Sequence, residues 1–197
     1  SPSGSGLYMS IAWHSGLHAD GLPPVTAAAA VAVRFAVGYV LGQRADIKWV
    51  NDVLVDGKKV CDILAECSER SDGADIVIGI GINLTPPEGG FPPELGGAGA
   101  LCSHMEPEVA EELAASVIAE LCALLDGGGA DEIMSRYREG CCSIGGKLRL
   151  RRDGGAVEYT ALDIGDDGEL IVESPDGERL TVISAAEVCR PAEREIY

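Results

Sequence analysis

The sequence predicts an α+β fold, in which a mixed β-sheet with packed helices is followed by a small β-barrel. Residues 1–143 combine runs of alternating apolar residues, typical of strands, with longer segments of helical periodicity. From Gly146 the pattern changes to short alternating segments separated by Gly and Asp-Gly turns, which is typical of a small antiparallel barrel or sandwich. We therefore expect a first domain over residues 1–143 and a second over residues 144–197.

The first elements of the chain are predicted to be a strand and a buried helix. Apolar residues alternate with smaller or more polar ones over Leu7–Trp13, which indicates a strand. A loop follows, and then the Ala- and Val-rich segment from Pro24 to Leu41 reads as a helix. Proline in its first turn and Gly42 just beyond its end suit a helix start and a helix stop.

Short strands separated by turn residues are expected over residues 46–84. The Asn51-Asp52 pair and the Asp56-Gly57 pair mark turns between them. The last run, ADIVIGIGINL, is nearly all apolar, which is typical of a strand covered on both faces. The expected strands are Asp46–Val50, Val53–Val55, Lys58–Glu66 and Ala74–Leu84.

The rest of the first domain is predicted to be a loop and two helices. Residues 86–103 are rich in glycine and proline, as loops are. A helix is expected after Pro107, because apolar residues recur there at helical spacing with acids on the other side. A second, shorter helix is expected at Asp131–Glu139.

Composition limits the classes of function. The chain has 197 residues and a formal net charge of -17, so we expect no nucleic-acid partner, since binding phosphates requires clustered Lys and Arg. Its apolar runs are too short or too interrupted to cross a membrane, so we expect no membrane partner either. The seven cysteines form no CxxC pair and the histidines lack metal-ligand spacing, which argues against zinc. We expect a cytoplasmic protein with reduced cysteines, and Cys61 and Cys67 as packing residues.

Lys48 stands in an apolar strand, between Ile47 and Trp49. Strand alternation sends its side chain to one face of the sheet and the side chains of its two neighbours to the other. An unpaired buried ammonium is costly, so Lys48 must reach solvent or meet an anion. Either it is a surface lysine and Asn51-Asp52 form an ordinary turn, or these residues form a site for a phosphate or carboxylate and for polar ligand groups or a cation.

The segment GIGIN, Gly79–Asn83, presents a similar choice. Two glycines one residue apart weaken a strand unless something approaches the backbone closely. The segment is not a dinucleotide-binding fingerprint, because a third glycine and a following helix are absent. Close approach by a flat ligand and tight packing of a helix on the sheet both fit.

Taken in order, these motifs resemble the biotin protein ligase family, the biotin–[acetyl-CoA-carboxylase] ligases. The family's KWPND segment appears as KWVND at Lys48–Asp52, and its hairpin of the form DGRKLAGILVE appears as DGKKVCDILAE at Asp56–Glu66. Its GxGIN strand is GIGIN at Gly79–Asn83, and its SPxGxLYxS segment is SPSGSGLYMS at Ser1–Ser10. The last segment, ending near ISAAEVCR, resembles the family's small SH3-like barrel. The resemblance covers almost the whole chain and favours biotin ligases over lipoate ligases, which share the catalytic fold.

The resemblance implies a two-step ATP-dependent ligase. Such enzymes form biotinyl-5'-AMP from biotin and ATP with magnesium, and then transfer biotin to a lysine of a biotin carboxyl carrier protein. Lys48 matches the family's central lysine and is the expected catalytic residue, while Asp52 is the expected magnesium ligand. The residues expected to bind biotin or the adenylate are Lys48, Asn51, Asp52, Lys59, Gly79, Gly81 and Asn83.

The sequence departs from the family pattern in three places. The glycine- and arginine-rich loop GRGRxGR, which covers biotin and the phosphates, does not precede SPSGSG in this chain. Val50 replaces a proline, and Asp62 replaces a glycine at a place where its carboxylate would repel the adenylate or point to solvent. We therefore expect impaired activity, with a non-catalytic ligase-like protein that binds biotin, a nucleotide or the carrier as the alternative. A DNA-binding function is not expected, and an exposed sheet edge would favour a homo-oligomer.

Overall fold

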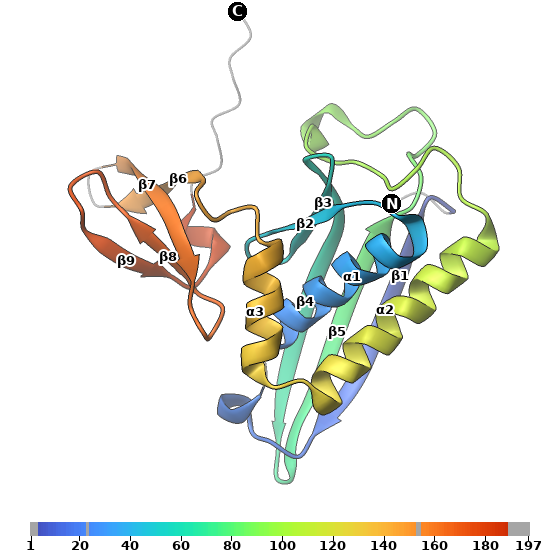
Figure 1. Ribbon diagram of the computed structural model, residues 1–197, viewed down its shortest axis with the longest axis horizontal. Coiled ribbons are helices and arrows are strands. Elements are labelled where there is room, and N and C mark those ends of the chain that lie inside the picture. The colour runs from blue at the N-terminus through green and yellow to red at the C-terminus, as the bar shows by residue number, and fades with distance from the viewer. Residues whose placement is uncertain (1–3, 23, 153–154, 189–197) are drawn as a thin grey trace, which may run out of the picture. The chain divides into compact units, whose positions relative to one another are not determined.

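The computed structural model describes residues 4–22, 24–152 and 155–188 (Figure 1). The chain divides into two compact units, Ser1–Cys141 and Cys142–Tyr197. Ser1–Ser3 of the SPSGSG segment and Cys189 and Arg190 of the ISAAEVCR segment lie outside the described residues.

The first unit is built on a β-sheet whose strand order, over the described residues, is β1-β5-β4-β3-β2. All of the neighbouring strand pairs in that order are antiparallel. Parallel pairing enters at isolated bridges, which join Ile47 to Cys141 and Lys59 to Ala98. The strands are β1 Gly6–Ser15, β2 Ala45–Lys48, β3 Asp52–Val55, β4 Lys58–Arg70 and β5 Gly73–Asn83.

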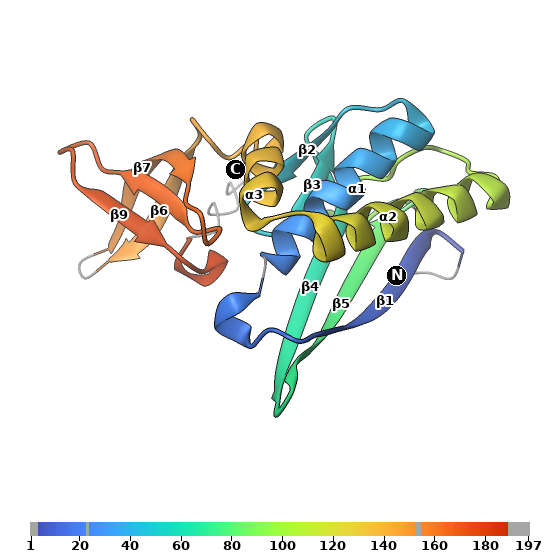
Figure 2. The ribbon, with the colours of Figure 1, turned by 60° about the horizontal axis from the view of Figure 1, so that its bottom comes forward.

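Helices α1 (Val25–Leu41) and α2 (Pro107–Gly127) lie across one face of this sheet, and Figures 1 and 2 show both from different sides. Both match the predicted helices, and α1 ends where Gly42 adopts the left-handed conformation with φ 63°. The shorter helix α3 spans Ala130–Gly140, close to its predicted bounds. These helices place the apolar core on one side of the sheet.

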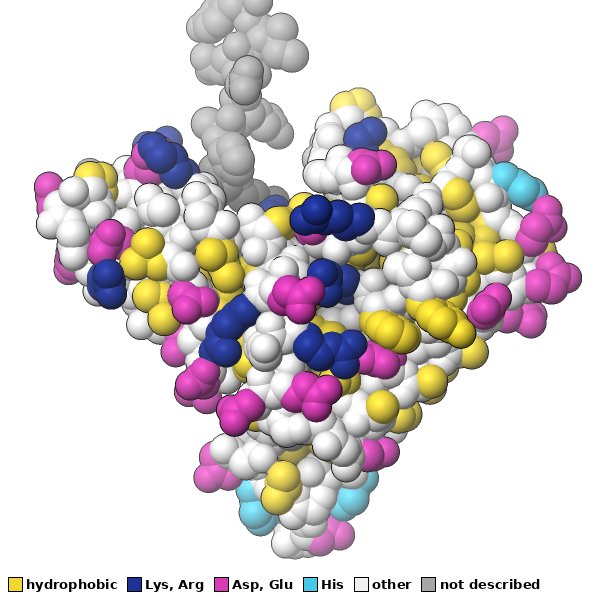
Figure 3. Space-filling view, in the orientation of Figure 1, with side chains coloured by type: hydrophobic (Ala, Val, Ile, Leu, Met, Phe, Trp, Pro, Cys, Tyr) yellow, Lys and Arg dark blue, Asp and Glu magenta, His cyan; other side chains and the backbone are white. Residues whose placement is uncertain are grey.

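Small residues let α1 lie close to the sheet. Its residues from Ala27 to Val33 are almost completely buried. Phe35 and Tyr39, on the outer side of the same helix, are exposed, with stacked rings whose centroids are 5.8 Å apart. Figure 3 shows apolar side chains at the surface over α1 and α2, on the face away from the sheet.

The expectation that the GIGIN strand is covered on both faces is wrong. Along β5 the isoleucines at positions 76, 78, 80 and 82 are buried, whereas Val77 between them is 46% exposed. The helices cover one face of the sheet, and the glycines and Asn83 belong to the other. The apolar composition misled because Gly79 and Gly81 count as neither polar nor large, so the alternation is hard to see in the sequence.

The two cysteines of β4 differ in burial. Cys61 is buried, as predicted, whereas Cys67 is exposed. The prediction that both are packing residues is therefore wrong for Cys67, because β4 runs on to Arg70, beyond the part of the sheet that the helices cover.

The second unit contains an antiparallel sheet of order β6-β7-β8-β9. Its core is formed by alternating residues such as Leu150, Tyr159 and Val172, all of which are buried. The predicted short strands are present, while the barrel itself stays a prediction. The strands are β6 Lys147–Arg152, β7 Gly155–Ile164, β8 Leu170–Glu173 and β9 Arg179–Val182.

Within the described parts of both units, no helix has the length and apolar character needed to cross a membrane.

Candidate functional site

One residue from each strand of the first sheet contributes to a continuous row on the face opposite the helices. Tyr8 of β1 pairs with Gly81 of β5, and Gly81 also pairs with Asp62 of β4. Asp62 in turn lies opposite Asp52 of β3, which lies opposite Lys48 of β2. Directly opposed residues in an antiparallel sheet project from the same face, so this row sets an aromatic ring, an open glycine, two carboxylates and an ammonium side by side.

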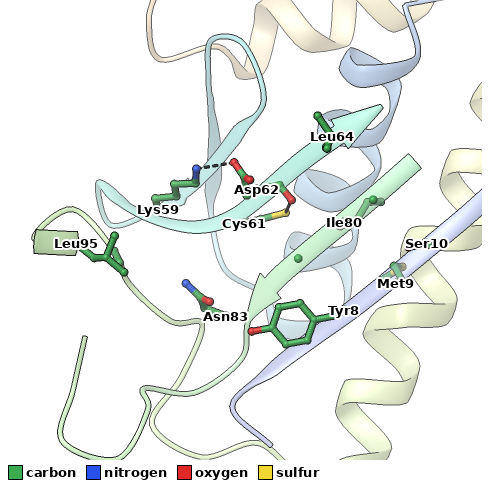
Figure 4. A pocket seen from close by; sticks show the side chains of 13 residues that line it. Tyr8, Met9, Ser10, Lys59, Cys61, Asp62, Leu64, Ile80, Asn83 and Leu95 are labelled. Atoms are coloured by element: carbon green, nitrogen blue, oxygen red, sulfur yellow. Dashed lines mark hydrogen bonds and ion pairs between the residues drawn. The ribbon is translucent and has the colours of Figure 1, made fainter. Parts of the chain in front are cut away.

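A cavity of about 580 Å³ lies over one end of this row. Tyr8 and Leu95 form two of its sides, and Lys59 and Asp62 lie together on another (Figure 4). Gly81 leaves the floor of the cavity open beneath Tyr8. A side-chain methyl group at this position would contact the Tyr8 ring at 3.4 Å and would fill that space. The glycines of GIGIN thus give a ligand access to the backbone of β5.

A β-bulge in β4 decides which side chains face the cavity. Val53 pairs with Cys61, but the next residue, Leu54, pairs with Lys59, so Val60 is an extra residue on the β4 side. In a regular strand, residues three positions apart project from opposite faces. The extra residue in the bulge shifts the alternation by one position, so Lys59 projects from the same face as Asp62.

Lys59 is held between two carboxylates. Its Nζ atom lies 2.6 Å from Oδ1 of Asp52 and 2.6 Å from Oδ1 of Asp62. On the far side of Asp52, the Nζ atom of Lys48 lies 3.9 Å from Oδ2. These four side chains form a chain of alternating charges along the sheet.

The pKa of Lys59 is raised in the folded protein. Burial, the largest single influence, acts to lower this pKa, but the hydrogen bonds and negative charges of Asp52 and Asp62 together outweigh it. Lys59 therefore stays an ammonium at neutral pH and is available as a cation rather than as a base.

The loop over residues 86–103 is attached to the sheet beside the cavity. The backbone N–H of Lys59 donates to the carbonyl of Gly97, and the N–H of Gly99 donates to the carbonyl of Lys59, both at 2.8 Å. The side chain of Asn83 donates from Nδ2 to the carbonyl of Gly99 at 3.0 Å. The loop is thus held to β4 and to the end of β5, at the wall of the cavity.

Several of the predicted site residues meet at this cavity. Tyr8 and Leu95, which also line it, were not predicted. Tyr8 alternates with Leu7 and Met9, so the strand period could have assigned it to the opposite face, whereas Leu95 lies in an irregular loop without such a signal. The predicted residues that line the cavity are Lys59, Gly79, Gly81 and Asn83.

Lys48 and Asp52 stand beside the cavity rather than in its lining. The side chain of Lys48 is 57% exposed on the face opposite the buried Ile47 and Trp49, as alternation predicts. Asp52 is 18% exposed and links Lys48 to Lys59. Asp52 thus contacts a residue of the cavity wall, and Lys48 neighbours that wall through Asp52.

Asn51 serves the turn between β2 and β3. Its Nδ2 donates to the carbonyl of Ile63 at 2.7 Å, which ties the turn to β4. From α3, the hydroxyl of Tyr137 donates to the carbonyl of Val50 at 2.9 Å. These two hydrogen bonds hold the turn after Lys48 from both sides. The Trp49–Val50 peptide bond within this turn is cis.

Asp52 does not suit a magnesium ion held by the protein. Both of its oxygens already face ammonium groups. Among the described residues, no group of three or more His, Cys, Asp or Glu side chains could hold a metal. Magnesium binds proteins through few carboxylates and keeps water or phosphate as its other ligands, so an ion here would depend on a phosphate ligand.

The sequence is similar to known ligases. The family model described as the Biotin/lipoate A/B protein ligase family matches residues 1–83. A biotin–[acetyl-CoA-carboxylase] ligase of Paracoccus denitrificans is 35% identical over 170 residues, which cover 81% of this chain and 70% of that protein. The bifunctional ligase/repressor BirA of Bacillus spizizenii is 31% identical over 185 residues, or 90% of this chain and 56% of that protein. The chain thus spans little more than half the length of that relative.

The fold is also that of solved ligases. The apo structure of biotin protein ligase from Aquifex aeolicus matches with a TM-score of 0.72 at 21% identity, covering 94% of this chain and 81% of the other. The same enzyme in complex with biotin and ATP matches with a TM-score of 0.69 at 19% identity, covering 94% and 78% of the two chains.

Proposed function

Because the chain belongs to the biotin–[acetyl-CoA-carboxylase] ligase family, we propose that it activates biotin with ATP and transfers it to a lysine of a carrier protein. The observation that carries the proposal is the cavity on the open sheet face, where Gly79 and Gly81 form the floor and Lys59 the cationic wall. A flat apolar ligand with an anionic linkage matches that combination of open backbone and ammonium.

The first step joins two anions. The carboxylate of biotin attacks the α-phosphorus of ATP, a bond forms from carboxylate oxygen to phosphorus, and pyrophosphate leaves. Lys59, at the cavity, and Lys48, next along the row, supply the positive charge that offsets the repulsion and stabilises charge on the transferring phosphoryl group. Lys48 is the proposed catalytic residue, and no covalent enzyme intermediate is required.

The remaining residues position the ligand and the loop. Asn83 holds residues 86–103 against the sheet through Gly99, which supports a closed wall beside the nucleotide. Asn51 keeps the turn after Lys48 attached to β4, so the ammonium is presented from a fixed backbone. Pre-organisation of this kind lowers the cost of ordering the site when substrate binds.

The second step is acyl transfer. A lysine amine of a biotin carboxyl carrier protein attacks the carbonyl of biotinyl-5'-AMP, the carbon–oxygen bond to phosphate breaks, and AMP leaves with the amine proton lost to solvent. The carrier approaches from the open face of the sheet. Since ATP is a substrate of the cell interior, we place the reaction in the cytoplasm. We also propose that the second unit is the family's SH3-like domain.

One observation favours the alternative of a non-catalytic ligand-binding protein. Lys59 is already paired with both Asp52 and Asp62, which reduces the charge it offers to a phosphate. In that case the protein would bind biotin, the nucleotide or the carrier without turnover.

The two functions are separated by measuring each half-reaction on the 197-residue chain. Biotin-dependent exchange of pyrophosphate into ATP reports adenylation, and release of AMP from added biotinyl-5'-AMP in the presence of a carrier domain reports transfer. Biotin ligase activity requires both signals. Saturable binding of biotinyl-5'-AMP, biotin, ATP or the carrier domain without either signal establishes the binding protein, and absence of binding to all four rejects both functions.

A further inference from the structure

Asp62 stands where an anionic ligand would need to bind. Its carboxylate lines the cavity and meets the Nζ atom of Lys59 at 2.6 Å, as the dashed line in Figure 4 marks. A phosphate or carboxylate entering the cavity would seek the same ammonium. The carboxylate of Asp62 thus takes the place of the ligand's own charge.

The geometry points to Asp62 as a specificity-determining residue, which competes with the ligand anion for Lys59 and so weakens the binding of anionic ligands relative to neutral ones. This inference rests on the proposed function, because it concerns the ligand of the same cavity. It assigns to Asp62 an attenuating role rather than a catalytic one.

The two partners of Lys59 are not equivalent. Asp52 is 18% exposed, lies outside the cavity lining, and also faces Lys48, so it stays fixed between two cations. Asp62 is 61% exposed and is held by Lys59 from the cavity side. Rotation of an exposed side chain is fast and inexpensive, so Asp62 is the partner that an incoming anion displaces.

Charge balance gives the expected direction. With both carboxylates in place, the charges of Lys48, Asp52, Lys59 and Asp62 balance, so the row offers a phosphate no excess positive charge. After Asp62 is neutralised, the row carries a net charge of one positive unit, and the ammonium of Lys59 can donate to a ligand oxygen without displacing a carboxylate. The gain must become smaller if the ammonium is removed, since only the direct repulsion between Asp62 and the ligand then remains.

The test is calorimetric titration of the 197-residue chain and of Asp62→Asn with two probes, anionic biotinyl-5'-AMP and the neutral biotin methyl ester. Asp62→Asn should bind biotinyl-5'-AMP about five- to tenfold more tightly, as expected for loss of one nearby like charge, and should bind the methyl ester unchanged. Asp56→Asn removes the same charge from the exposed turn between β3 and β4, outside the lining of the cavity, and should leave both affinities unchanged. Asp62→Ser repeats the neutralisation with a different side chain.

The double variant Lys59→Met/Asp62→Asn completes the test. Its affinity for biotinyl-5'-AMP should exceed that of Lys59→Met by much less than Asp62→Asn exceeds the unmodified chain, because without the ammonium Asp62 no longer competes for it and only its direct repulsion of the ligand remains. Equal binding of biotinyl-5'-AMP by the unmodified chain and Asp62→Asn overturns the role of Asp62 and leaves the proposed function standing. Binding by neither protein overturns both, because neutralising Asp62 would then not release the site. A gain of the same size without Lys59 also overturns the inference.

Discussion

Lys59 and Asp62 lie three positions apart on β4, yet their side chains meet on one face of the sheet with Nζ and Oδ1 2.6 Å apart. The bulge at Val60 makes this contact possible, because it shifts the pairing with β3 by one residue between Val53 and Leu54. The charge at the cavity wall is therefore set by an irregularity of the backbone as much as by the residues themselves.

Replacement of Lys48 by alanine should weaken the binding of biotinyl-5'-AMP by about ten- to a hundredfold, the range expected for one charge-assisted hydrogen bond. The ammonium is exposed on the open face and has a carboxylate of Asp52 as its neighbour at 3.9 Å, so it is free to turn toward an anion. Titration calorimetry on both proteins measures the change. Lys58→Ala, which removes an exposed lysine at the start of β4 outside the cavity lining, is the matched control. Equal affinity of Lys48→Ala and the unmodified chain would exclude Lys48 from the site.

Replacement of Asn83 by alanine should loosen the loop over residues 86–103. The lost hydrogen bond from Nδ2 to the carbonyl of Gly99 is worth about 1 kcal/mol of local stability. Hydrogen–deuterium exchange should show faster exchange at the amide of Gly99, which donates to Lys59, with no change along β7 of the second unit. Unaltered exchange throughout the loop would mean that its backbone hydrogen bonds suffice to hold it.

The cysteines of β4 should differ sharply in reactivity toward a thiol reagent. Burial raises the pKa of the Cys61 thiol, with the charge of Asp62 acting in the same direction, so little thiolate forms there. Cys67 is exposed and should be alkylated by iodoacetamide in the native protein, as read by mass spectrometry of the peptides. Denatured protein supplies the control in which both react, and native labelling of Cys61 as fast as Cys67 would contradict the packing.

The pair between His18 and Glu69 should make the stability of the protein depend on pH. The hydrogen bond from the Nδ1 atom of His18 to Glu69, 2.9 Å long, and the negative charge of that carboxylate raise the pKa of His18 above its ordinary value of 6.5. Because the folded pKa is the higher one, the stabilisation is complete below that ordinary value and is lost as the pH rises through the folded value. The same pair lowers the pKa of Glu69 below its ordinary value of 4.5. Both groups are therefore charged at pH values between the lowered pKa of Glu69 and the raised pKa of His18.

The check is the thermal midpoint of the protein minus that of His18→Asn, measured at about pH 5.5 and about pH 8.5. The difference should be positive at the lower pH and smaller at the higher one, and only slight because both side chains are exposed. Glu69→Gln should abolish the same dependence. A difference that grows toward high pH would reverse the sign of the linkage.

Much of the fold could be predicted from the regular alternation of strands and from the residues at helix ends. Alternation placed Lys48 on the face opposite Ile47 and Trp49, and Pro24 and Gly42 marked the limits of α1. These signals are local, since each depends on the period of a strand or on the end of a helix.

What the sequence did not predict depends on departures from regularity. No period predicts that Lys59 would share a face with Asp62, because the bulge cancels the alternation. The loop that brings Leu95 to the cavity has no repeating pattern. Asn83 was expected to bind the ligand, but its side-chain N–H donates to the carbonyl of Gly99. Such contacts follow from which strands are neighbours, which is a property of the tertiary fold.

The row from Tyr8 to Lys48 contains one residue from each strand of the first sheet. No short segment of the chain can therefore form the site by itself. A ligand that spans this row can be bound by the assembled sheet and not by a partly unfolded one. Occupancy is then linked to global unfolding, and at a ligand concentration about a hundredfold above Kd the native state gains about 2.7 kcal/mol. Ligand-induced protection of all the strands together, the central β4 and the edge strands β1 and β2 alike, would be the signature of that cooperativity.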